Sequence, residues 1–194
     1  MILINTKLSN NLKKIIGNNV EDVLLFGSTV KGKDKPNDTD ILIIFKNKVD
    51  KEVEFLIKKE LEKYYKNVSI VSKTIKTVFE ESFDARESLL FEAVSLINKK
   101  FVNDKYGFVS LGMFLYSLNG WSNLQKTKFY HALNGRNSLG MLKELKCIKL
   151  SDNVILSPLN KIEPLIEFFD SWKIKYKYVP ILVPKRLESY LERL

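Results

Sequence analysis

Two short motifs near the start of the chain hold residue types that could do chemistry. Gly27-Ser28 is followed, after nine residues, by Asp38-Thr39-Asp40. The apolar runs 23–26 and 41–45 beside them are typical of strands buried on both faces. Side chains alternate along a strand, so Asp38 and Asp40 should project from one side, about 6.5–7 Å apart. Such a pair is costly to ionise without a cation, so the pattern predicts a divalent metal site, and Mg²⁺ suits carboxylates and phosphates.

The turn at Gly27-Ser28 has the groups that a phosphate needs. Gly27 has no Cβ, so its backbone can approach a ligand closely. Ser28 offers a hydroxyl and an N–H, and it could cap a short helix near Thr29 whose N-terminus would attract an anion. Lys31 and Lys33 stand nearby and could neutralise further charge. The sequence therefore predicts a triphosphate cradle opposite a metal-binding strand.

Taken together, these motifs resemble the signature of the nucleotidyltransferase superfamily related to DNA polymerase beta, and most of all its minimal nucleotidyltransferases. The resemblance covers about residues 8–100. It implies a nucleoside triphosphate substrate, expected to be ATP, and Mg²⁺ as cofactor. Carried over by position, Gly27, Ser28 and Lys31 would bind the triphosphate. Asp38 and Asp40 would be the catalytic metal ligands.

One departure from that signature concerns a third carboxylate, which active members usually carry on the next central strand. The strand expected at 68–72 has Ser69 and Val71 where an acid would stand. Glu80, Glu81 and Asp84 lie further along and could fold back. A site with two carboxylates would hold a second ion weakly. We favour an enzyme, with a catalytically weak or inactive member as the alternative.

The order of predicted elements indicates an α+β protein with two domains. Residues 1–103 should form the nucleotidyltransferase fold, a mixed sheet with flanking helices. Residues 104–194 should form a smaller, basic helical domain with a β-hairpin, in a layout like that of a winged helix. The expected helices are 7–17, one starting near 28, 50–65, 74–81, 84–98, 109–118, 122–134, 139–146, 161–171 and 185–194. The expected strands are 20–26, 39–46, 67–72, 147–150, 154–157 and 174–183.

The excess of basic over acidic residues is concentrated in the second half of the chain. The chain has 32 basic and 23 acidic residues, and residues 104–194 hold 14 and 8 of them. A basic surface attracts polyanions, nucleic acids above all. A solvated basic helix in a lysine-rich protein is the alternative interpretation. The residues predicted to form a nucleic-acid face are Lys126, Lys128, Tyr130, His131, Arg136 and Lys143.

Composition also bears on the compartment and the lineage. The single cysteine, Cys147, excludes an internal disulfide and fits a reducing cytoplasm. No run reaches the ~18 apolar residues of a membrane span, so we expect a cytoplasmic protein without a membrane partner. Residues 111–136 resemble a segment that follows the nucleotidyltransferase domain in archaeal proteins, which implies an archaeal type of architecture.

The leading hypothesis is a Mg²⁺-dependent transfer of a nucleoside monophosphate from an NTP to a hydroxyl. The acceptor would be a protein or an RNA recruited by the basic second domain. Two alternatives stay open. The chain could be a nucleic-acid-binding regulator that keeps the fold without the activity. It could also be an antitoxin-like partner of a small toxin, because the resembled family often works in such pairs.

Overall fold

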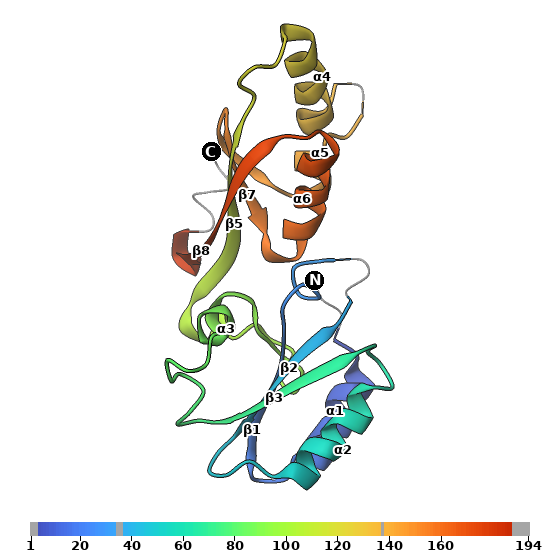
Figure 1. Cartoon of the computed structure of the whole chain (residues 1–194), viewed down its shortest axis with the longest axis vertical. Helices are drawn as coiled ribbons and strands as arrows, with labels where there is room; N and C mark the ends of the chain where they lie inside the picture. Colours follow the sequence, from blue (N-terminus) through green and yellow to red (C-terminus); the bar gives the residue numbers. More distant parts are fainter. Residues whose placement is uncertain (1–3, 34–36, 137, 188–194) are drawn as a thin grey trace. The chain divides into compact units, whose positions relative to one another are not determined.

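The computed structural model describes residues 4–33, 37–136 and 138–187 of the chain. The chain divides into two compact units, residues 1–106 (unit 1) and 107–194 (unit 2). Figure 1 shows both, with unit 1 in blue to green and unit 2 in yellow-green to red. Each unit has its own four-stranded sheet.

Unit 1 is built on a mixed sheet with the strand order β3-β2-β1-β4. β2 and β3 are parallel, and β1 pairs antiparallel with β2 and with β4. This mixed sheet agrees with the predicted fold class. The strands are β1 (Val20–Phe26), β2 (Thr39–Phe45), β3 (Val68–Thr74) and β4 (Val94–Ser95).

Helices cover both faces of this sheet. α1 (Thr6–Ile15) and α2 (Lys51–Leu61) lie side by side on one face (Figure 1). Asn5 and Asp50 cap these helices by accepting hydrogen bonds from backbone N–H groups of the first turn. The other face is covered by the segment 75–93, which contains α3 (Arg86–Glu92). Its core consists of Leu24, Leu42, Val78, Phe83, Leu89 and Ala93.

Three helix predictions in unit 1 were wrong or too long. The segments after Ser28 and at 74–81 are successive turns and not helices. The helix expected at 84–98 ends at Glu92, because Val94 and Ser95 pair with β1. Pairing with a neighbouring strand here overrides local helical periodicity. A short 3₁₀ helix, η1 (Asn103–Tyr106), ends the unit.

Unit 2 is an antiparallel sheet with the order β6-β7-β5-β8, packed against helices. Its long strands are β5 (Phe108–Ser117) and β8 (Lys175–Pro184), and its hairpin is β6 (Ile148–Ser151) and β7 (Val154–Pro158). The helices are α4 (Asn123–Asn134), α5 (Met141–Leu145), η2 (Leu159–Lys161) and α6 (Ile162–Ser171).

Aromatic rings fill the core of unit 2. Phe114 on β5 lies edge-on to Phe169 of α6, with ring centroids 5.8 Å apart. Phe129 of α4 is fully buried and stacks on Phe168 at 5.9 Å. Gly112 lets α6 approach the sheet, since a Cβ there would lie 2.9 Å from Cγ1 of Ile162. The close approach of helix to strand therefore depends on a residue without a side chain.

The helix predicted at 109–118 was wrong, because these residues form β5, the central partner of both β7 and β8. The predicted layout had three helices before the hairpin, but β5 takes the place of the first and leaves α4 and α5 to precede the hairpin, so the winged-helix layout is not confirmed. The other predicted elements of this half are present, including the hairpin. Of the final helix expected at 185–194, residues 185–187 are helical and the rest lies outside the described residues.

Candidate nucleotide-binding site

The glycine turn predicted to bind phosphate lies directly against Asp40. Gly27 has a φ of +81°, in the left-handed region that favours glycine. A Cβ built on Gly27 would lie 2.6 Å from Oδ2 of Asp40, so any side chain at this position would clash with the carboxylate. The register of the sheet produces this contact, because Phe26 at the end of β1 pairs with Asp40 near the start of β2. The structure thus brings the two motifs together.

The backbone after Gly27 folds into tight turns. The N–H groups of Val30 and Lys31 donate to the Gly27 carbonyl oxygen at 3.1 and 3.4 Å, and Lys33 N–H donates to the Ser28 carbonyl at 3.2 Å. The expected helix N-terminus is therefore absent, and these N–H groups are already used. No described residue accepts a hydrogen bond from the N–H or the hydroxyl of Ser28. Ser28 keeps both donors for a ligand.

A buried glutamate that the sequence analysis missed completes this cradle. Glu92, the last residue of α3, is 4% exposed. Its Oε1 accepts a hydrogen bond from Gly27 N–H at 3.0 Å, and its Oε2 lies 2.9 Å from Nζ of Lys31. Glu92 therefore engages two of the groups predicted to bind a triphosphate. We name Gly27, Ser28, Lys31 and Glu92 the anion cradle.

Two neighbouring carboxylates, those of Asp38 and Glu92, act on the carboxylate of Asp40 at this end of the sheet. The pKa of Asp40 is raised above its usual value, first by burial and then by the negative charges of Asp38 and Glu92. Asp38 is exposed and directly precedes β2. A divalent cation between the two aspartates would relieve both the burial cost and the repulsion. The two carboxylates fit such a cation, and the absence of a Cβ on Gly27 keeps the space beside the Asp40 carboxylate free of a side chain.

The protein alone offers this cation few ligands. Within the described ranges, no group of three or more acidic, histidine or cysteine residues is placed to hold a metal ion. Mg²⁺ usually keeps one or two carboxylates and completes its shell with water and substrate phosphates. Asp38 and Asp40 fit that pattern, with phosphate oxygens as the remaining ligands.

β3 supplies no acid, as its sequence indicates. Ser69 pairs with Asp40 and Val71 pairs with Leu42 in the parallel register. The acids that could have folded back do not reach the site: Glu80, Glu81 and Asp84 are exposed, and the pKa of Asp40 responds to Asp38 and Glu92 instead.

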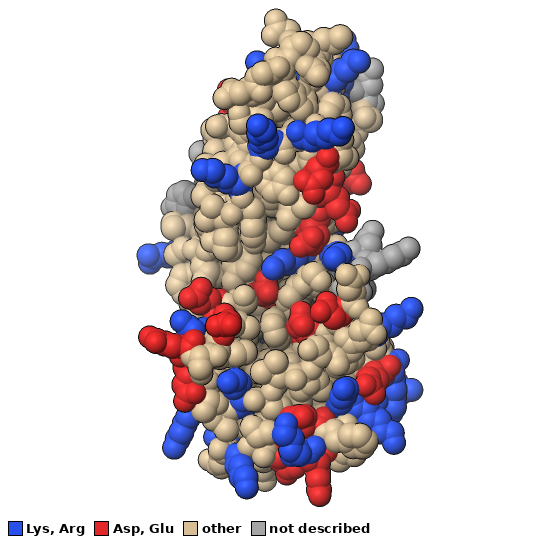
Figure 2. Space-filling model, viewed as in Figure 1, with Lys and Arg blue, Asp and Glu red and all other residues tan. Residues whose placement is uncertain are grey.

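The residues predicted to form a nucleic-acid face do not form one surface in unit 2. Lys126 and Tyr130 share one side of α4, where Nζ of Lys149 lies 5.8 Å from the Tyr130 ring centroid. Lys128 faces a different direction and lines a cavity with two tryptophans. The remaining members, His131, Arg136 and Lys143, are exposed. On the face drawn in Figure 2, the basic side chains of unit 2 are scattered, with acidic ones nearby.

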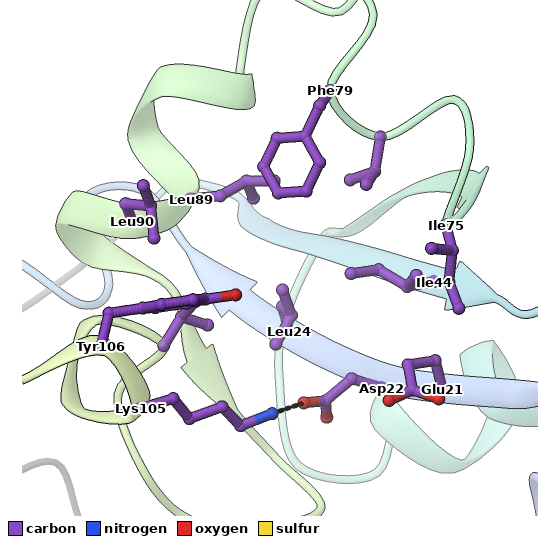
Figure 3. A pocket seen from close by; sticks show the side chains of 12 residues that line it. Glu21, Asp22, Leu24, Ile44, Ile75, Phe79, Leu89, Leu90, Lys105 and Tyr106 are labelled. Atoms are coloured by element: carbon purple, nitrogen blue, oxygen red, sulfur yellow. Dashed lines mark ion pairs between the residues drawn. The ribbon is translucent and has the colours of Figure 1, made fainter.

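None of the predicted site residues lines a hollow found elsewhere in unit 1. It has a volume of about 210 Å³ and lies over the half of β1 remote from the Gly27 turn. Figure 3 shows Phe79, Leu90 and Tyr106 around it, with Asp22 and Lys105 on one side. Nζ of Lys105 lies 3.9 Å from Oδ2 of Asp22. The hollow is mainly apolar, which does not suit a triphosphate.

Fold and site together define unit 1 as a domain of the nucleotidyltransferase class. Residues 10–95 match the family described as polymerase beta, nucleotidyltransferase. Unit 1 therefore carries a minimal nucleotidyltransferase domain of the polymerase beta-like superfamily, and the resemblance found in the sequence is confirmed. Comparisons with curated proteins and with solved structures gave no match. In the described part of the chain, no helix has the length and apolar character needed to cross a bilayer.

Proposed function

We propose that the protein transfers a nucleoside monophosphate from an NTP, with ATP as the expected donor, to a hydroxyl group of a protein or RNA acceptor. Mg²⁺ would be held by Asp38 and Asp40 together with the phosphates, where it would neutralise charge. The observation that carries this proposal is the close approach of the Gly27 turn to Asp40, where a Cβ on Gly27 would lie only 2.6 Å from Oδ2 of Asp40. It supports a site in which a phosphate chain meets a metal-binding carboxylate.

The chain's own residues would bind and orient the donor. Ser28 offers an N–H and a hydroxyl to the phosphate oxygens, and Lys31, whose ammonium group is paired with Glu92, would exchange that partner for a phosphate. The acceptor hydroxyl would attack the α-phosphorus and release its proton to water, forming a new P–O bond, while the bond to the bridging α–β oxygen breaks and pyrophosphate leaves. Catalysis of this kind consists mainly of positioning and charge stabilisation.

The test uses two labels. Purified protein is incubated with Mg²⁺, candidate acceptors and an NTP labelled at either the α- or the γ-phosphate. We expect the α-label in the acceptor and the γ-label in pyrophosphate. The variant carrying Asp38→Asn and Asp40→Asn should neither label the acceptor nor release labelled pyrophosphate. Equal transfer by this variant and the wild type would overturn the proposal.

The second candidate is a nucleotide-binding regulator without transfer activity. The observation that favours it is the β3 register, which places Ser69 and not an acid opposite Asp40. That protein would bind an NTP and Mg²⁺ but release no pyrophosphate with any acceptor. Equilibrium binding of a non-hydrolysable NTP, combined with the labelled-transfer assay, separates the two candidates. The toxin-like partner and the cytoplasmic location stay predictions from the sequence.

A further inference from the structure

Both tryptophans of the chain meet in unit 2. Trp121 precedes α4 and Trp172 follows α6, and their ring centroids are 6.5 Å apart with the planes tilted by 31°. Each packs edge-on against the buried ring of Phe129, at 6.0 and 5.6 Å. Both indoles nevertheless keep part of their surface exposed. The core thus holds two large aromatic rings in place, and both remain partly accessible to solvent.

These indoles line a cavity of about 350 Å³ together with two lysines. Its lining residues are Trp121, Gln125, Lys128, Ser171, Trp172 and Lys173. Neither Lys128 nor Lys173 forms an ion pair with any residue that the structure describes. The nearest acid in sequence, Asp170, acts on Tyr176: after burial, its charge and hydrogen bond raise the pKa of that phenol. The cavity therefore combines apolar rings with two cations that pair with no acid in the described ranges.

The backbone at the end of α6 holds Lys173 beside the rings. Lys173 has a φ of +54°. Its N–H donates to the Asp170 carbonyl oxygen at 2.9 Å, and Ile174 N–H donates to that of Phe169 at 3.0 Å. This pair of bonds is the Schellman motif, in which the left-handed position is usually glycine. A lysine in this conformation is less favourable than a glycine. Replacing Lys173 by glycine should therefore remove the charge without destabilising the fold.

We infer that this cavity binds single-stranded nucleic acid, with an unpaired base stacked on Trp121 or Trp172 and phosphates near Lys128 and Lys173. Stacking platforms flanked by basic groups recognise single strands without sequence preference, because every base has a π-face. The combination of tryptophan rings and lysines favours this ligand over an acidic protein segment, since a base-and-phosphate repeat matches both the rings and the cations. The binding site rests on unit 2 alone. A role in presenting the acceptor also rests on the proposed function.

The chain provides its own probe, because its two tryptophans are both in this cavity. Full-length protein is titrated with single-stranded RNA and DNA oligonucleotides while indole fluorescence is recorded, without NTP or Mg²⁺. We expect quenching by the oligonucleotides and none by inorganic polyphosphate, which has charge but no bases. A duplex of the same sequence should bind more weakly. Comparison of the RNA and DNA strands shows which sugar the site prefers.

Substitutions separate stacking from charge. Trp172→Ala should weaken binding about tenfold or more, and Trp172→Phe should weaken it less, because one stacked base is worth ~1–3 kcal/mol. Lys128→Gln should reduce the slope of log affinity against log salt by about 0.7, the value for one phosphate on a single strand. Circular dichroism confirms that each variant is folded.

A matched pair of lysines provides the decisive control. Lys146 after α5 has a φ of +57°, and Cys147 N–H donates to the Leu142 carbonyl oxygen in the same type of motif, but Lys146 does not line the cavity. Lys173→Gly and Lys146→Gly remove the same charge and relieve the same backbone strain. Both should leave the unfolding midpoint equal or higher, and only Lys173→Gly should weaken binding.

Equal weakening by the two substitutions would indicate general attraction by a basic protein and would overturn the inference, as would unchanged fluorescence with every oligonucleotide. Because these titrations need no transfer, a failed transfer assay leaves them standing. Equally, transfer to a protein acceptor could persist if no oligonucleotide binds.

Discussion

The two ends of β1 each hold a buried carboxylate paired with a lysine, yet they differ in what the carboxylate does. Near the start of β1, Oδ1 of Asp22 accepts hydrogen bonds from Ser95 Oγ at 2.7 Å and from Val23 N–H at 2.9 Å. Its lysine, Lys105, is 3.9 Å away. Beyond the other end, Glu92 accepts from Gly27 N–H and lies 2.9 Å from Lys31.

The difference lies in the partners. Ser95 is on β4, so Asp22 ties β4 to β1, and its hydrogen-bond partners belong to the fold. Gly27 N–H and Lys31 are groups that a phosphate would bind. Glu92 therefore occupies, from within the chain, the place of an anionic ligand. A buried acid points to function when its partners suit a ligand, and to architecture when they belong only to the fold.

The largest effect should come from Asp40, the acid beside the Glu92 end. Asp40→Asn removes a metal-binding charge and should lower the rate of transfer by about 10³-fold, a typical loss for one strong electrostatic group. The matched variant Asp22→Asn should transfer at the wild-type rate. Initial rates with α-labelled NTP measure both. A comparable loss in Asp22→Asn would abolish the distinction between the two ends.

The next effect concerns stability at the Asp22 end. Asp22→Ala leaves the buried Ser95 hydroxyl and Val23 N–H without their acceptor, which should lower the free energy of unfolding by about 2 kcal/mol. Asp22→Asn keeps an acceptor oxygen and removes a carboxylate whose charged form is disfavoured by burial. It should therefore change the free energy of unfolding little. Urea unfolding of the three proteins measures the difference. Similar losses in both variants would show that charge, and not the acceptor, is what the fold uses.

A smaller effect of unusual sign is expected at Glu92. Glu92→Gln keeps an acceptor for Gly27 N–H but frees Lys31 and removes a negative charge from the anion cradle. Affinity for an NTP without Mg²⁺ should therefore rise, by about tenfold for ~1.4 kcal/mol of relieved repulsion and competition. Isothermal titration calorimetry gives the value, with Lys31→Met as the variant expected to bind less. Weaker binding by Glu92→Gln would mean that Glu92 braces the turn and does not compete with phosphate.

The smallest effect is a pH dependence of stability. Burial raises the pKa of Asp22 above 3.8 in the folded state, so the folded protein holds this proton more tightly than the unfolded chain. Its contribution therefore favours folding increasingly as the pH falls through that raised pKa towards 3.8. Against the opposing effect of burial, hydrogen bonds with Ser72 and Lys51 lower the pKa of Glu54, and hydrogen bonds with Lys63 and Asn11 lower that of Glu60, so the stabilisation from these two acids is lost as the pH falls below 4.5.

Asp22→Asn should lack the first of these phases. The free energy of unfolding of the wild type should thus rise relative to that of the variant as the pH is lowered from 7 towards 3.8, in thermal unfolding monitored by circular dichroism. A constant difference over this range would show that Asp22 does not titrate there.

The sequence predicted the part of unit 1 where local pattern and chemistry coincide. β1 and β2 contain the continuous apolar runs 23–26 and 41–45, and the motifs beside these runs show where the turn and the acids lie. Glu92 was missed because its role depends on where α3 ends relative to β1. One signal was present, a lone acid inside the apolar stretch 89–94.

The error at β5 has a different cause. Residues 108–117 contain no charge and many aromatic or branched side chains, which fit a strand as well as a buried helix. Their pairing with β7 and β8, distant in sequence, decides the outcome. Local pattern cannot reveal such partners. The tryptophan cavity escaped notice for the same reason, since Trp121 and Trp172 are far apart in the chain.

The outer strand of unit 2 has a consequence for how the protein behaves at high concentration. Among the strands of the described residues, β8 pairs with β5 alone, and it carries Pro180 and Pro184, while Lys175 and Lys177 are exposed at its start. An open strand edge ordinarily invites a second molecule to add its own strand, the first step of fibrillar aggregation. Prolines provide no N–H for that extension, and like-charged ammonium groups repel an identical neighbour. The fold thus carries a safeguard against self-polymerisation along this border.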